Sequence, residues 1–154
     1  MTDDDNQAPD HRQMAVDTFN ATWGLLDKQM RTADENDMMV HSAHASRYHW
    51  SQAGGPVEFE RGDWQLSRVY SVLGKGGEAL HYAKHCLNTC LENEIGDFDL
   101  AFAYEAIARA HAVLGNWEES DRNLQNSKRA AESIAKDEDK QYLLGELDSI
   151  PRMP

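Results

Sequence analysis

The sequence predicts an all-α fold, a helical-hairpin solenoid of about seven helices. The main observation is an internal repeat with a 41-residue step, in which Leu66-Ser67-Arg68, Tyr70 and Val72-Leu73-Gly74 return as Ile107-Ala108-Arg109, His111 and Val113-Leu114-Gly115. Apolar residues recur at helical spacing throughout, without strand-like alternation of useful length. A repeat unit of this size cannot bury its apolar face alone, so we expect the units to stack.

Composition narrows the classes of partner. Charged residues make up 27% of the 154 residues and hydrophobic residues 40%, which is ordinary for a globular domain. The formal net charge of −12 argues against nucleic acid or an anionic membrane surface as the main partner. The opening residues lack the pattern of a secretory signal, and no apolar run approaches the roughly 20 residues that span a bilayer. We therefore expect a cytoplasmic protein.

The sequence predicts an acidic, disordered tail over residues 1–9 and a single helical domain over residues 10–154. Its N-terminal helix pair covers residues 10–53. Phe19, Trp23, Leu26 and Met30 form the apolar stripe of a first helix over 10–30. A capping box of Thr32 with the glutamate three residues later begins the second helix. The Gly-Gly-Pro at 54–56 ends it.

The repeat predicts two hairpins, over 58–95 and 97–136. In the first, a glycine-rich turn at 74–77 joins two helices, and Cys86 and Cys90 lie on the apolar face of the second, where we expect buried, reduced thiols. In the second, Asp97 is expected to cap the first helix, and Asn116 with Glu119 to form a capping box for the next. A capping helix over 138–150 is expected to cover the open end of the stack.

These hairpins resemble tetratricopeptide repeats. The first hairpin has the characteristic residues Trp64, Leu66, Tyr70, Gly74, Ala79 and Ala83, and the second has Tyr104, Ile107, Ala108, Gly115, Trp117 and Leu124. The step is longer than the usual 34 residues and is similar to the longer repeats of kinesin light chain. The resemblance covers residues 58–150. It implies a right-handed superhelix whose concave face holds peptides or other proteins.

Carried onto this chain, the resemblance implies concave-face positions in both hairpins: Trp64, Arg68, Ser71, Phe102, Glu105, Arg109 and Ala112. Arg68 and Arg109 are one repeat step apart, and side by side they could bind a carboxylate or a phosphate. The alternative is that these arginines pair with nearby carboxylates such as Asp63 or Glu105 and form a solvated ladder that contributes little to stability. In a further alternative, the chain's own N-terminal helix fills the groove.

A second functional hypothesis rests on the segment 41–50. His41 and His44 share a helix face, whereas His49 points away, so these histidines do not form a metal site by themselves. In this hypothesis a small-ligand or metal-binding pocket, or the active site of an enzyme, lies between the second helix and the repeats. The residues that would line this pocket are His41, His44, Arg47, Tyr48 and Trp64. The alternative is a polar cluster that only stabilises the fold.

Other histidines favour structural roles. His81 and His85 share a helix face without the glutamate of a zinc-protease helix, so we expect them at the surface. His111 takes the repeat position of Tyr70, where it is expected to fill an aromatic slot in the core.

The favoured function is a non-catalytic interaction module that binds a protein or peptide through its concave face. The candidate binding residues are Trp64, Arg68, Phe102, Glu105, Arg109, Arg47 and Tyr48. No metal, cofactor or catalytic residue is predicted, since no nucleophile elbow, phosphate loop or cysteine–histidine pairing is present. A homo-oligomer is compatible with the apolar ends that a short solenoid leaves.

Overall fold

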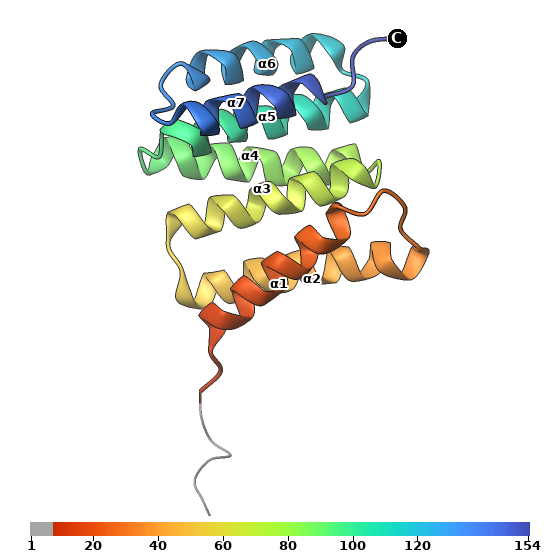
Figure 1. The fold of residues 1–154 in the computed structure, drawn as a ribbon, viewed down its shortest axis with the longest axis vertical. Coiled ribbons are helices and arrows are strands. Elements are labelled where there is room, and N and C mark those ends of the chain that lie inside the picture. Colours follow the sequence, from red (N-terminus) through yellow and green to blue (C-terminus); the bar gives the residue numbers. More distant parts are fainter. Residues whose placement is uncertain (1–7) are drawn as a thin grey trace, which may run out of the picture.

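A computed structural model of the chain describes residues 8–154, and the tail expected at 1–9 lies almost wholly outside them. Within this part of the chain all regular structure is helical, which confirms the all-α prediction and the number of helices (Figure 1). The helices are α1 (His11–Leu26), α2 (Ala33–Ala53), α3 (Pro56–Val72), α4 (Gly76–Glu92), α5 (Asp97–Leu114), α6 (Trp117–Ala131) and α7 (Asp137–Asp148).

Consecutive helices pack against each other along the chain. In Figure 1 the α1–α2 pair lies at one end of the molecule, α3 and α4 in the middle, and α5 and α6 at the other end. Helix α7 folds back onto α5 and α6, and α3 also contacts α5. None of the helices in residues 8–154 has the length and apolar character needed to cross a membrane.

The N-terminal pair follows the prediction except at the end of its first helix. The Thr32–Glu35 capping box is present, with both reciprocal hydrogen bonds, and begins α2 as predicted. Helix α1, however, ends at Leu26 rather than near residue 30, and Met30 is 88% exposed. The expected apolar stripe is therefore shorter, because its last member lies in the connection to α2.

The bends of the two hairpins have the same geometry. Gly74 and Gly115 both adopt left-handed backbone conformations, with φ of 75° and 77°. After them, the amide of Lys75 donates to the carbonyl of Tyr70, and that of Asn116 to the carbonyl of His111, each over 2.8 Å. These are the bonds of a glycine C-cap, which satisfies the last carbonyls of a helix.

Two of the expected caps are wrong. Gly96 is the N-cap of α5, and the carboxylate of Asp97 instead accepts hydrogen bonds from the amides of Phe98 and Ala135. Asn116 is the N-cap residue of α6 but makes no side-chain capping bond, because its amide nitrogen lies 3.3 Å from Nδ1 of His111. The side-chain amide of Asn116 therefore contacts His111 near the end of α5 and does not cap α6.

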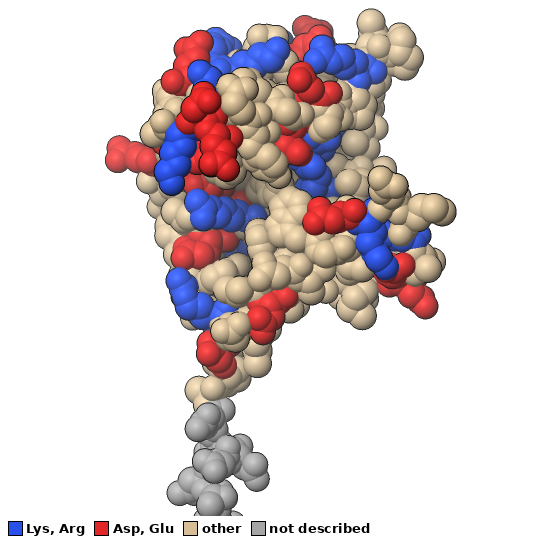
Figure 2. Space-filling view, in the orientation of Figure 1, with Lys and Arg blue, Asp and Glu red and all other residues tan. Residues whose placement is uncertain are grey.

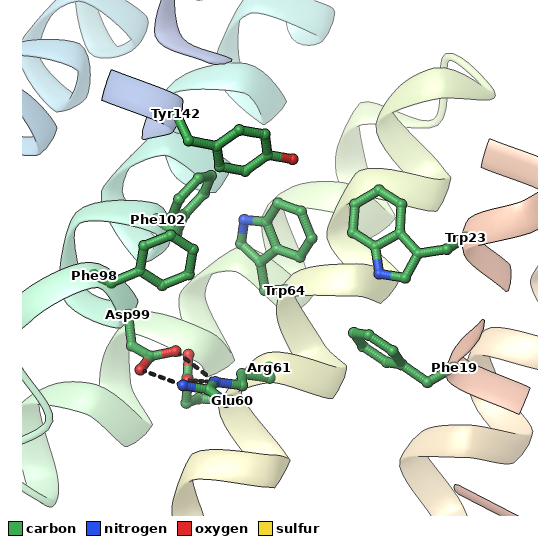
Figure 3. Close-up of a pocket in the computed structure, with 9 residues that line it drawn as sticks. All are labelled: Phe19, Trp23, Glu60, Arg61, Trp64, Phe98, Asp99, Phe102 and Tyr142. Atoms are coloured by element: carbon green, nitrogen blue, oxygen red, sulfur yellow. Dashed lines mark hydrogen bonds and ion pairs between the residues drawn. The ribbon is translucent and has the colours of Figure 1, made fainter. Parts of the chain in front are cut away.

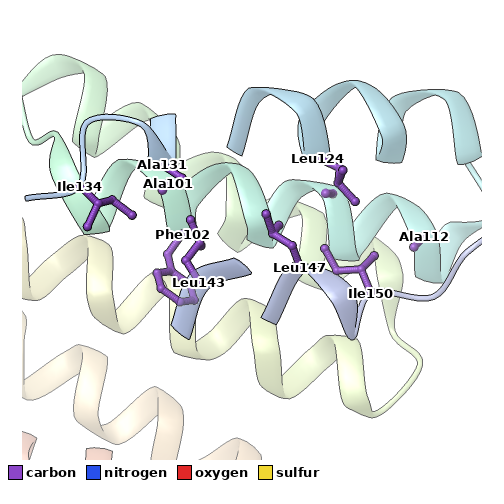
Figure 4. Packing of buried hydrophobic residues seen from close by; sticks show 10 residues of the cluster. Ala101, Phe102, Ala112, Leu124, Ala131, Ile134, Leu143, Leu147 and Ile150 are labelled. Atoms are coloured by element: carbon purple, nitrogen blue, oxygen red, sulfur yellow. The ribbon is translucent and has the colours of Figure 1, made fainter. Parts of the chain in front are cut away.

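The C-terminal core joins α5, α6 and α7 (Figure 4). Leu143 and Leu147 of α7 are fully buried there, and Ile150 is 3% exposed, so α7 packs its apolar residues against α5 and α6. Between α4 and α5 the core consists mainly of small residues, among them Ala83, Ala103 and Ala106. Small residues let α4 and α5 approach closely, and Trp64 of α3 packs against them.

Candidate aromatic cleft

A solvent-open cleft of about 240 Å³ lies between α1 and α7, on the face shown in Figure 2. Its lining comes from four helices that alternate along the chain. We call it the aromatic cleft, and its residues are Phe19 and Trp23 of α1, Glu60, Arg61 and Trp64 of α3, Phe98, Asp99 and Phe102 of α5, and Tyr142 of α7 (Figure 3).

Trp64 lies at the centre of the cleft. Its ring centroid is 5.6 Å from that of Trp23 on one side and 5.6 Å from that of Phe102 on the other, where the two rings meet edge to face. Phe102 in turn contacts Phe98 at 4.5 Å and Tyr142 at 5.9 Å. Both separations from Trp64 lie within the range that favours aromatic pairs. The cleft is thus a continuous aromatic surface.

Charged groups form one side of the cleft. Arg61 donates two hydrogen bonds to Asp99, Nε to Oδ1 at 2.8 Å and Nη2 to Oδ2 at 3.0 Å. Glu60 lies beside them and is 1% exposed. Burial, together with the neighbouring Asp99, raises the pKa of Glu60 to about 10. The Glu60 side chain therefore carries a proton at neutral pH, and the Arg61–Asp99 pair leaves this side of the cleft without net charge.

Behind the cleft, Glu60 contacts two free thiols. Oε2 of Glu60 lies 3.4 Å from Sγ of Cys86 and 3.6 Å from Sγ of Cys90, and both cysteines are buried, as expected. We call these three residues the glutamate–cysteine cluster. A hydrogen bond with Cys90, burial and the Glu60 carboxyl raise the pKa of Cys86. In residues 8–154 this cluster is the group of three histidine, cysteine or carboxylate donors close enough together to hold one metal ion.

The two repeat-related arginines are paired internally. Oε1 of Glu105, which is fully buried, accepts hydrogen bonds from Nη2 of Arg68 at 2.9 Å and from Nε of Arg109 at 2.8 Å. Arg68 also bonds Glu146 of α7 at 2.7 Å, and Arg109 donates to Ser149. The pairing with carboxylates that the alternative expected is found, but the pairs are largely buried and do not form a solvated ladder. Of the two acids named for it, Glu105 has this role.

The residues predicted for the concave face lie in three places: in the aromatic cleft, beside it under α7, and in the interior. Trp64 and Phe102 line the aromatic cleft. Arg68, Glu105 and Arg109 lie next to it but are largely buried under α7, and Nε1 of Trp64 donates to Glu105 at 3.1 Å. Ser71 and Ala112, also expected on the concave face, are buried. The N-terminal helix supplies one wall of the cleft through its own aromatic residues and leaves the cleft open.

The residues of the alternative pocket do not converge. Nε2 of His44 lies 2.8 Å from the hydroxyl of Tyr70, while Arg47 pairs with Asp63 at 3.0 Å. Tyr48 is 58% exposed and contacts the rings of two other histidines at the surface. His81 and His85 are exposed as expected, whereas His111 is only half-buried.

Sequence reasoning missed most of the cleft, including Phe19, Trp23, Phe98 and Tyr142. A signal was present. Trp23 lies one 41-residue step before Trp64, and the same step leads on to Glu105 and then to Glu146. The 41-residue step that relates the two hairpins thus also relates Trp23 of α1 and Glu146 of α7 to them.

Compared with known proteins, the chain matches no protein-family model, no curated protein and no solved structure.

Proposed function

We propose that this protein is a non-catalytic interaction module of the tetratricopeptide-like type, which binds a protein or peptide segment in the aromatic cleft. The observation that carries this proposal is the continuous aromatic surface contributed by α1, α3, α5 and α7 and open to solvent. Aromatic residues are enriched where binding energy concentrates in interfaces. Tyr142 at the cleft is 53% exposed, which is a large apolar area to leave in water without a partner.

The size of the cleft supports an anchor side chain as its occupant. Its volume of about 240 Å³ lies below the roughly 300–1,000 Å³ of typical small-molecule sites. One large apolar side chain of an extended or helical segment fits this space, and the rest of the segment then lies over α1 and α7. Binding of this kind requires no acid, base or nucleophile in the cleft.

Charge favours a basic partner. The whole chain carries −12, while the Arg61–Asp99 pair and the protonated Glu60 leave the cleft itself without net charge. A basic segment is attracted to the molecule over long range, and its apolar residue then enters the neutral cleft. We therefore propose a partner with one large apolar residue flanked by lysine or arginine, whose association slows as salt increases.

The tetratricopeptide-like assignment is supported by the two equivalent bends. Gly74 and Gly115 share a left-handed conformation and the same pattern of hydrogen bonds. Trp23, Trp64 and Glu105 follow one another at the repeat step on successive first helices of the hairpins. In such an arrangement the first helices line one face, which is the face where the cleft lies.

A displayed peptide library tests this function. We expect selection on the protein to enrich peptides with a large apolar residue among basic ones. Tyr142→Glu should weaken binding of the enriched peptides by at least ~10-fold, since it removes an aromatic wall and adds a charge. Tyr48→Glu is the matched control, because Tyr48 is similarly exposed (58%) but lies on α2, away from the cleft.

Tryptophan spectra locate the binding site independently. The indole N–H resonances of Trp23 and Trp64 should shift when an enriched peptide is added, and that of Trp117 should not. Enriched peptides that bind equally well to both tyrosine variants, or that shift only the Trp117 resonance, would contradict the proposal.

A further inference from the structure

The glutamate–cysteine cluster has no role in the proposed peptide binding. Glu60 lies on α3, and Cys86 and Cys90 lie one turn apart on α4, with their ligand atoms all within 4.8 Å of one another. All three residues are at most 1% exposed. A buried carboxyl is a costly choice for a helix interface, since it must be desolvated.

Packing alone does not require these three residues. One repeat step later, the equivalent positions in the second hairpin are Ala101, Ser127 and Ala131. These residues are also at most 1% exposed, and the Ser127 hydroxyl donates to the carbonyl of Ala101 at 2.8 Å. Small residues therefore fill the same place in the neighbouring hairpin, and the donor atoms of the first hairpin are additional to what the interface needs.

The spacing of the donors matches tetrahedral zinc coordination. With Zn–S of about 2.3 Å and Zn–O of about 2.0 Å at tetrahedral angles, sulfur and oxygen ligands lie about 3.5 Å apart. The observed distances from Oε2 of Glu60 are 3.4 Å to Cys86 and 3.6 Å to Cys90. In addition, the buried Oε1 of Glu60 has no hydrogen-bond partner in the described part of the chain.

The carboxyl of the cluster borders the cleft. Glu60 lines the cleft together with Arg61 and Asp99, whereas Cys86 and Cys90 are not among its lining residues. Arg61 lies beside Glu60 and is itself held by its two hydrogen bonds to Asp99. A charged neighbour that orients a ligand carboxylate is a common feature of metal sites.

We propose that Glu60, Cys86 and Cys90 bind one thiolate-preferring divalent cation, of which Zn²⁺ is the best match. Binding forms two metal–sulfur bonds and one metal–oxygen bond and releases the two thiol protons and the carboxyl proton to solvent. The resulting group has a net charge of minus one and lies beside the Arg61 guanidinium, which is 3.7 Å from Glu60. This site does not depend on peptide binding in the cleft.

Cobalt and zinc titrations test the site on the full-length, tag-free, reduced protein. Co²⁺ should bind with one-to-one stoichiometry and give the ultraviolet charge-transfer absorption of cobalt–thiolate bonds, and Zn²⁺ should then displace it. Bound Zn²⁺ should also raise Tm and slow alkylation of both cysteines. A titration without thiolate charge-transfer absorption, or without any slowing of alkylation, overturns the proposal.

Variants separate this site from other sources of metal affinity. Glu60→Gln keeps the shape of the side chain and should weaken Co²⁺ binding by at least ~10-fold. The triple variant Glu60→Ala, Cys86→Ser, Cys90→Ala copies the second hairpin, so it should remain folded by circular dichroism and lose the absorption.

The control is His81→Ala with His85→Ala, because these rings lie 4.6 Å apart on the surface of α4 and can bind cations themselves. This variant should keep the cobalt–thiolate absorption and the one-to-one stoichiometry. Loss of both in the histidine variant, or their retention in the triple variant, would place the metal elsewhere and refute the assignment.

Discussion

In each of the hairpins α3–α4 and α5–α6 a serine hydroxyl bonds an alanine carbonyl on the other helix. The serine lies on the first helix in one hairpin and on the second helix in the other. In the first hairpin the hydroxyl of Ser67 on α3 donates to the carbonyl of Ala79 on α4 at 2.8 Å. In the second, Ser120 on α6 donates to the carbonyl of Ala108 on α5 at 2.9 Å. These are the same two positions, one repeat step apart, with serine and alanine exchanged. What the hairpins share is therefore a close approach bridged by one hydroxyl, whichever helix supplies it.

The hairpins differ where their first helices meet other parts of the molecule. Trp64 of the first hairpin and Glu105 of the second occupy equivalent positions, and the indole of Trp64 donates to the Glu105 carboxylate. The position thus serves the aromatic cleft in one hairpin and an ionic cluster under α7 in the other. The serine–carbonyl contact within each hairpin is therefore the same. The faces between the hairpins and toward α7 differ in their residues and roles.

The largest expected effect comes from Glu105→Ala. This change leaves Arg68 and Arg109 without their shared carboxylate and Trp64 Nε1 without its acceptor. Breaking a buried charge pair in this way costs about 3–5 kcal/mol. Urea denaturation measures it. Glu146→Ala is the comparison, and we expect a smaller loss because the Glu146 side chain is 26% exposed. Equal losses would show that burial at Glu105 does not set the cost.

The next effect tests whether the two bends are energetically equivalent. Gly74→Ala and Gly115→Ala place a Cβ on a left-handed residue, and no atom lies within 4 Å of either Cβ. Each substitution should therefore reduce the free energy of unfolding by the backbone strain alone, about 1–2 kcal/mol. The two values should agree within the error of urea denaturation. A clear difference would mean that the bends are alike in geometry but not in the role they have in stability.

A smaller change in the free energy of unfolding tests whether the serine–carbonyl contacts of the two hairpins are equivalent. Ser67→Ala removes a buried hydroxyl and its bond, at a cost of about 1 kcal/mol. The double variant Ser67→Ala, Ala79→Ser recreates the arrangement of the second hairpin and should recover most of this loss. Ala79→Ser alone is the control for crowding at the fully buried position 79. A double variant as unstable as the sum of its single changes would contradict the equivalence of the two contacts.

Several features that depend only on local sequence could be predicted, whereas most features that depend on contacts between helices could not. The bends could be predicted because Gly74 and Gly115 mark left-handed residues in the sequence itself. The end of α1 could not, since Met30 fits the helical spacing and its exposure depends on the path to α2. The cap expected of Asn116 was missed for a local reason, because its side-chain amide lies 3.3 Å from the ring of His111, five residues earlier.

The site was predicted less completely than the fold. Trp64 and Phe102 were found because the repeat register places them on the first helices. Glu60 was given no role, because only the packing of α3 on α4 brings it to the two cysteines. Burial of Arg109 depends on α7, which lies outside the two recognised hairpins. Local patterns thus identified the bends and a carboxylate partner for both arginines, and missed the contacts that α1, α7 and the two cysteines make.

The smallest expected effect concerns pH, at the position where Tyr70 and His111 are equivalent. Burial lowers the pKa of His111 from its usual 6.5, although Glu119 opposes this shift, and burial also lowers the pKa of His44, which bonds Tyr70. Above pH 6.5 each histidine is neutral in both states and adds no pH dependence. As pH falls through 6.5, the unfolded chain takes up the proton first, so the free energy of unfolding decreases until pH reaches the lower folded-state pKa.

His111→Tyr gives the second hairpin the residue of the first and removes one of these two groups. The decrease in the free energy of unfolding between pH 7 and pH 5 should then be shallower than in the unchanged protein, as measured by urea denaturation at each pH. His44→Gln should likewise make the decrease shallower, because it removes the other histidine whose pKa is lowered by burial. Slopes that are unchanged in both variants would show that neither histidine is held neutral by the fold.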